Sequence, residues 1–143
     1  MKAVRVINGR GMPLNRADVD TDQIIPSDWL KRVERTGFGA GLFSEWREAD
    51  DFVMNHDHFA DANVLVAGPN FGTGSSREHA VWALQDYGFE AVLSSRFADI
   101  FRNNSAKTGL LPVTLPQDVI ERIQTALEHD HTMAIIIDVE QRR

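Results

Sequence analysis

Between residues 63 and 139, short apolar runs alternate with longer amphipathic stretches, and this alternation constrains the fold more than any other feature of the sequence. The apolar runs predict strands at 63–67, 91–94, 110–115 and 133–139. The stretches between them predict helices at 75–87 and 97–107 and a third one that starts at Pro116. We expect the second helix to bury Phe97, Ile100 and Phe101. Strands that alternate with helices predict an α/β domain with a mostly parallel central sheet flanked by helices.

The N-terminal part of the chain is less regular. Residues 4–11 are typical of a strand that ends in a Gly/Pro turn. Residues 18–22 form an expected polar loop, and residues 27–33 are expected to form a short helix capped by Ser27. The segment from Gly37 to Gly41 has too many glycines for a stable element, so we expect a mobile loop there.

Length and composition set further limits. The chain has 143 residues, which is enough for a single domain over 1–143. Because Arg142 and Arg143 directly follow a predicted strand, we expect the complete fold to extend further. A net charge of −6 argues against nucleic acid as a partner. The absence of cysteine excludes disulfides, zinc–thiolate sites and iron–sulfur ligation by this chain.

Nothing in the sequence points to a membrane. No apolar run is long enough to cross a bilayer, and the first residues lack the pattern of a signal peptide. We therefore expect a cytoplasmic protein.

The segment from Gly72 to Glu78 joins a predicted buried strand to a predicted helix. Its glycines allow a sharp turn, and the first N–H groups of a helix stabilise an anion. Arg77 adds a charge whose shape suits a carboxylate. The alternative is purely local, because Ser75 and Glu78 have the spacing of a capping box. A P-loop and a dinucleotide fingerprint are both excluded, because the required lysine and third glycine are missing.

Other candidate sites are weaker. The pairs His56/His58 and His129/His131 each have a metal-like spacing but no third ligand nearby in sequence, so we expect no metal site in this chain. His79 follows Ser75 by one helical turn, and we interpret it as a packing residue.

The run from Asn70 to Ala80 (NFGTGSSREHA) resembles the signature of the swivelling domain of the aconitase superfamily. Three more segments resemble the small subunits of 3-isopropylmalate dehydratases. They are Asp20–Pro26, Trp29–Lys31, and Phe97–Asn104 with Gly109–Pro112. The resemblance spans nearly the whole chain and implies the swivelling β/β/α fold of that superfamily.

The resemblance also implies a chemistry. Such enzymes convert 2-isopropylmalate to 3-isopropylmalate in leucine biosynthesis by removing water and adding it back. It implies that Ser75 is the general base and that Arg77 and Ser76 bind the substrate. Asp22, Leu30 and Lys31 are implied as further substrate-binding residues. The family uses a [4Fe–4S] cluster, which a chain without cysteine must meet on a large-subunit partner.

Two alternatives remain at this level. A homoaconitase or a methylmalate-type dehydratase has the same chemistry on another dicarboxylate or tricarboxylate, and Leu30 favours an isopropyl group only weakly. A non-enzymatic module that binds phosphate or another anion at residues 72–76 belongs to a different class.

Overall fold

The computed structural model describes residues 6–14, 16–26, 38–48, 52, 54, 62–73, 78–130 and 134–138. The predicted helix at 27–33 lies outside these residues. Five strands form one sheet in the spatial order β4-β3-β2-β1-β5. The strands are β1 (Val6–Leu14), β2 (Val64–Ala67), β3 (Ala91–Ser94), β4 (Leu111–Thr114) and β5 (Ala134–Asp138). Strands β1 to β4 pair in parallel, which confirms the prediction of a mostly parallel sheet.

The last strand departs from the simple alternation of strands and helices. Strand β5 does not pair with β4. It lies at the opposite edge of the sheet, where it pairs antiparallel with Val6–Arg10 of β1. The rest of β1, from Gly11 to Leu14, pairs with β2. A Cβ on Gly11 would lie 2.6 Å from Cδ1 of Ile135 and 2.8 Å from Cδ1 of Leu127, so the glycine lets both side chains close over this junction.

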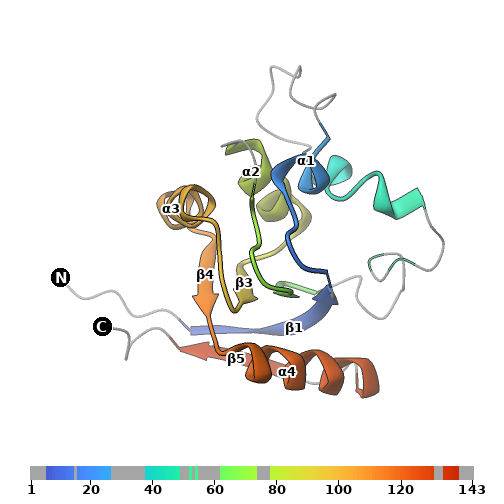
Figure 1. Cartoon of the computed structure of the whole chain (residues 1–143), viewed down its shortest axis with the longest axis vertical. Coiled ribbons are helices and arrows are strands. Elements are labelled where there is room, and N and C mark those ends of the chain that lie inside the picture. The colour runs from blue at the N-terminus through green and yellow to red at the C-terminus, as the bar shows by residue number, and fades with distance from the viewer. Residues whose placement is uncertain are drawn as a thin grey trace.

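Helices cover the sheet on both faces. Helices α2 (Glu78–Tyr87) and α3 (Asp99–Thr108) lie on one face, and α4 (Gln117–His129) lies on the other (Figure 1). All four residues of β2 and all four of β3 are buried. Their side chains alternate between two cores, with Leu65 in the core under α2 and Val64 in the core under α4. This sandwich explains why both strands are continuous apolar runs.

Two N-terminal segments contain helices that the sequence did not predict. The expected polar loop at 18–22 contains the start of a short helix, α1 (Thr21–Ile24), which the side chain of Asp20 caps in a capping box with Gln23. The glycine-rich segment contains the 3-10 helix η2 (Phe38–Gly41). Gly39 is buried there, and its N–H donates to Oδ2 of Asp86 at 2.9 Å. Close packing of η2 on α2 gives this segment the contacts that its own side chains lack.

A second 3-10 helix, η3 (Trp46–Glu48), follows η2, and Glu45 and Glu48 are exposed. Trp46 stacks on the buried ring of Phe43, with 5.5 Å between the ring centroids.

The prediction for the buried face of α3 was right for two residues and wrong for one. Phe97 and Phe101 are buried, but Ile100 is 54% exposed. Phe101 points toward the loop that follows β2, where it contacts Phe71 edge to face with centroids 5.2 Å apart. Ile100 directly precedes Phe101 in the chain, so it projects about 100° away around the helix and leaves that face.

Gly72 is packed directly on α3. Its φ of +88° lies in the region that favours glycine, and an added Cβ would lie 2.5 Å from Cβ and 2.8 Å from Cδ1 of Phe101. Gly109, which ends α3, has a similar φ of +93°, but a Cβ added there would have Nε2 of Gln85 as its neighbour, at 3.9 Å. The two glycines therefore share a backbone requirement and differ in their contacts.

We expect Gly72→Ala to lower the free energy of unfolding by about 3 kcal/mol, from backbone strain together with overpacking against Phe101. Gly109→Ala should cost only the backbone part, about 1 kcal/mol. Urea denaturation of both variants measures the difference. Equal losses in the free energy of unfolding would show that Phe101 can move away from the added methyl group without destabilising the fold.

Candidate functional site

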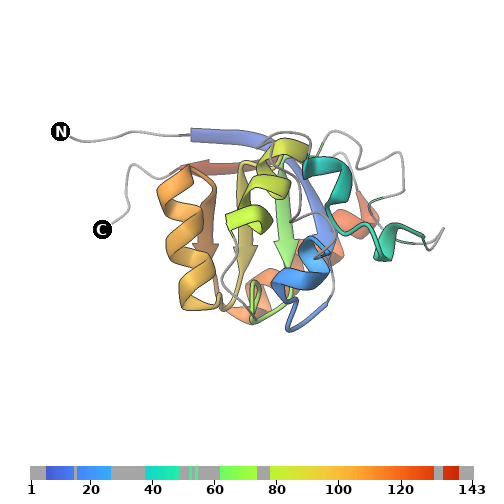
Figure 2. The same ribbon diagram turned by 90° about the horizontal axis from the view of Figure 1, so that it is seen from above.

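Three loops meet at one edge of the sheet. They follow β1, β2 and β3, and because these strands are parallel their carboxyl ends lie side by side. Figure 2 shows the arrowheads of β2, β3 and β4 pointing to the same edge, with α1 beside it. In open α/β sheets this is the edge where ligands bind.

The loop after β2 is bonded to the loop after β1 by its main chain. The N–H of Asp18 donates to the carbonyl of Pro69 at 2.8 Å. The N–H groups of Gly72 and Thr73 both donate to the carbonyl of Val19, at 2.7 and 3.1 Å. The N–H of Thr21 then donates back to the carbonyl of Thr73 at 2.8 Å. These bonds bring the start of α1 against Gly72 and Thr73, the first two residues of the Gly72–Glu78 segment.

The opposite side of the same loop is bonded to the loop after β3. The N–H of Phe71 donates to the carbonyl of Arg96 at 3.0 Å, and the N–H of Ala98 donates to the carbonyl of Phe71 at 3.1 Å. The buried hydroxyl of Ser94 lies 2.8 Å from the carbonyl of Gly68. The loop after β2 is therefore held from both sides up to Thr73.

This arrangement joins segments that are far apart in the sequence. The Asp20–Pro26, Asn70–Ala80 and Phe97–Asn104 segments were grouped only by resemblance. The structure links the first two through a bridge between Asp20 and Thr73, and the last two through a bridge between Phe71 and Phe97.

Of the predicted site residues, the structure places Asp22. It lies in the first turn of α1, is exposed, and follows Thr21, the residue whose N–H binds Thr73. The others, Ser75, Ser76, Arg77, Leu30 and Lys31, lie outside the described residues. The chain is described again from Glu78, the exposed first residue of α2.

Sequence reasoning missed two residues of this site, Asp18 and Asn70. Both have the left-handed backbone that non-glycine residues rarely adopt, with φ of 56° and 60°. The amide Nδ2 of Asn70 donates to Oδ1 of Asp18 at 2.9 Å. Asn and Asp are the side chains that tolerate this conformation best, so the residue types themselves were a weak signal.

The histidine predictions are tested only in part. His79 is half-buried on α2, and its ring lies 4.9 Å from the ring of Trp82, which agrees with a packing role. His129 is exposed at the end of α4. His56, His58 and His131 are outside the described residues.

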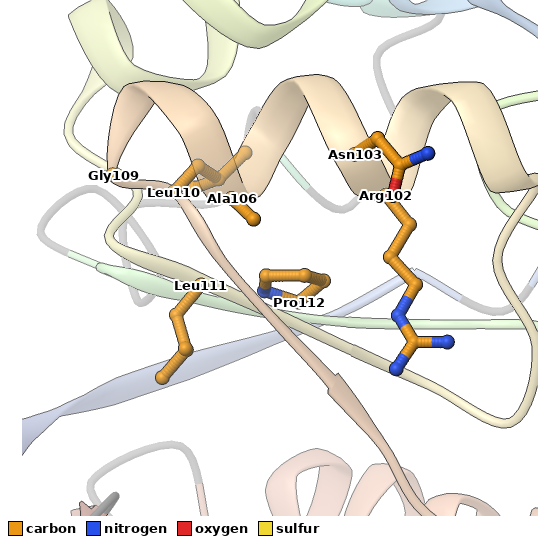
Figure 3. A pocket seen from close by; sticks show the side chains of 7 residues that line it. All are labelled: Arg102, Asn103, Ala106, Gly109, Leu110, Leu111 and Pro112. Carbon is orange, nitrogen blue, oxygen red and sulfur yellow. The ribbon is translucent and has the colours of Figure 1, made fainter.

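A pocket of 180 Å³ lies away from the loops, between α3 and the edge strand β4. It is lined by Arg102, Asn103 and Ala106 of α3 and by the chain from Gly109 to Pro112. Figure 3 shows the side chain of Arg102 reaching from α3 past Pro112. Except for Ala106, these residues belong to the third segment of the resemblance, but its link to the loops runs through Phe97, not through this pocket.

Comparisons with known proteins agree with this geometry. Residues 1–118 match the family model described as the aconitase C-terminal domain. The 3-isopropylmalate dehydratase small subunit of Frankia alni is 63% identical over 99% of this chain and 73% of its own length. That of Streptomyces griseus is 57% identical over 100% of this chain and 73% of its own length.

A solved structure supports the same assignment. The crystal structure of 3-isopropylmalate dehydratase from Methanocaldococcus jannaschii is 31% identical, with a TM-score of 0.72 over 96% of this chain and 73% of that one. The expected aconitase-type α/β fold is thereby confirmed. Sequence, fold and the convergence of the three segments all agree that the chain belongs to the 3-isopropylmalate dehydratase small subunits, within the aconitase C-terminal domain family.

Proposed function

We propose that the chain is the small subunit of a hydro-lyase that isomerises 2-isopropylmalate to 3-isopropylmalate in leucine biosynthesis, and that Ser75 is its general base. The observation that carries the proposal is the hydrogen bond between Thr21 and Thr73 in a chain of this family. Ser75 follows Thr73 by two residues, a span of at most about 7 Å. Asp22 follows Thr21 directly, so the bond brings both segments to one place.

The reaction requires removal of a weakly acidic C–H proton and departure of a hydroxyl group, followed by the reverse addition at the neighbouring carbon. Ser75 takes the proton as an alkoxide and returns it on rehydration. A serine hydroxyl is a weak acid, so its anion needs stabilisation. Ser75 lies just ahead of α2, whose ten residues give a positive N-terminal end. Arg77 adds a positive charge beside it.

The remaining predicted residues bind the substrate. Arg77 pairs with a carboxylate of the malate in the two-point geometry of a guanidinium, and Ser76 donates a further hydrogen bond. Asp22 completes the polar side of the site from α1. Leu30 contacts the isopropyl group, and Lys31, the next residue along the chain, is a further substrate-binding residue.

The chain holds only part of the active site. A [4Fe–4S] cluster supplies the Lewis acid for the departing hydroxyl in this proposal, and this chain has no cysteine to hold one. We therefore assign the cluster to a large subunit, with which this chain must associate in order to act. We place both subunits in the cytoplasm. Among the described helices, none is both long and apolar enough to cross a membrane.

The rival proposals differ in substrate or in class. A homoaconitase or methylmalate-type small subunit would use the same serine and arginine on another acid. A non-enzymatic anion-binding module would bind phosphate without a partner. Membership of a dehydratase family favours the enzyme over the module.

We expect Ser75→Ala to lower kcat of the reconstituted pair of subunits by about 10³-fold, because it removes the general base and leaves substrate binding intact. A coupled or direct absorbance assay of isopropylmalate isomerisation measures this. Thr125→Ala is the control, since it removes an exposed hydroxyl on α4, on the far face of the sheet. A Ser75→Ala pair with wild-type kcat would refute the assignment of the base.

We expect Leu30→Arg to shift kcat/KM away from isopropylmalate and toward a tricarboxylate by about 10- to 200-fold. The physical reason is that the variant loses an apolar contact and gains a charge that binds a third carboxylate. Assays of the reconstituted pair on isopropylmalate, homoaconitate and methylmalates measure the shift. If wild type already prefers homoaconitate or a methylmalate, the substrate proposed here is wrong.

A further inference from the structure

We propose that Asp18 and Asn70 are positioning residues, whose hydrogen bond aligns with α1 the loop that follows β2 and leads to Ser75. The inference rests on the proposed role of Ser75, since a positioning residue acts through the group that it places. Neither side chain is assigned a part in the chemistry itself.

The first support is the geometry of the pair. Nδ2 of Asn70 donates to Oδ1 of Asp18 at 2.9 Å, and the bond joins two loops separated by 52 residues. Both residues have a left-handed backbone, with φ of 60° and 56°. Such conformations persist in non-glycine residues only where the surroundings enforce them. The side-chain bond therefore joins the two points at which the crossing loops carry strain.

The second support is what the pair controls. Main-chain bonds flank it, from Asp18 to Pro69 on one side and from Gly72 and Thr73 to Val19 on the other. Both loops bend at residues 18 and 70, where the backbone is left-handed, next to these bonds. Beyond them, Thr21 binds Thr73, so a shift of either bend moves the chain that enters Gly74–Arg77 relative to Asp22.

The third support is the position of the two side chains outside the hydrophobic core. Asp18 is exposed and Asn70 is only half-buried, so neither fills the core. The backbone elsewhere in the loop is held by carbonyl and N–H groups, and the core beneath it by Phe71. The bond between Asn70 and Asp18 joins side chain to side chain across these two loops.

Asn70→Gly is the decisive variant, because glycine adopts a positive φ without strain and only the side-chain bond is lost. In the reconstituted pair of subunits we expect kcat to fall about tenfold, with KM unchanged within about twofold, because the base is misplaced while the substrate still binds. Asp18→Asn keeps an acceptor oxygen for Asn70 and should retain wild-type kcat. Gln85→Ala is the matched control, since it removes a 2.8 Å bond to the carbonyl of Thr108 far from the loops.

A double-mutant cycle with Asp18→Gly tests the pair as a unit. The double variant should be no slower than either single variant, whereas independent losses that multiply would overturn the inference. A wild-type kcat in Asn70→Gly would overturn it as well. In that case the activity of the wild-type pair would still stand, so the proposed function would survive.

Amide hydrogen exchange provides a readout that does not depend on activity. We expect the amides of Gly72 and Thr73 to exchange at least about tenfold faster in Asn70→Gly than in wild type, because their bonds to Val19 loosen. Gln85→Ala should leave both unchanged. Unchanged protection in Asn70→Gly would refute the positioning role, whatever the activity of the reconstituted pair. A wild-type pair that is inactive on every acid would instead refute the proposed function.

Discussion

The pairing of β2 on both of its edges is the constraint from which the rest of the structure follows. With β1 on one side and β3 on the other, β2 has no free edge, and all four of its residues are buried. A strand of this kind needs cover on both faces. Helices α2 and α3 supply it on one face and α4 on the other, which produces the two cores. The same pairing aligns the carboxyl ends of three parallel strands, and their loops then meet.

The loops at this edge of the sheet are held together by hydrogen bonds between main-chain groups. The loop after β2 is held by N–H and carbonyl groups of its two neighbours, from Asp18 on one side and from Arg96 on the other. Backbone groups need no particular side chain, so this support does not fix which side chains the loops carry. Among the described residues, this support reaches as far as Thr73, two residues before Ser75, to which we assign the reaction. A rigid approach to a reactive segment is the arrangement that general-base catalysis requires.

Left-handed residues are concentrated where the loops cross. Asp18, Asn70 and Gly72 all have positive φ within one cluster of hydrogen bonds. Gly72 needs its conformation because Phe101 occupies the space that a side chain would fill. Asp18 and Asn70 instead compensate with a bond between their side chains. The backbone is thus locally strained where the loop after β1, which leads into α1, meets the loop after β2, which leads to Ser75.

The sequence by itself determined the alternation of strands and helices, because the spacing of apolar residues shows which positions of each element are buried. It also identified the family, since the glycine–serine segment is long and specific, and it excluded thiolate ligands by composition. Only the tertiary structure decided that β5 crosses to β1, that η2 is a 3-10 helix packed on α2, and that Ile100 is exposed. It also decided that Asp18 meets Asn70. Each of these depends on contacts between residues far apart in the chain, and local periodicity carries no information about which distant surface a residue will meet.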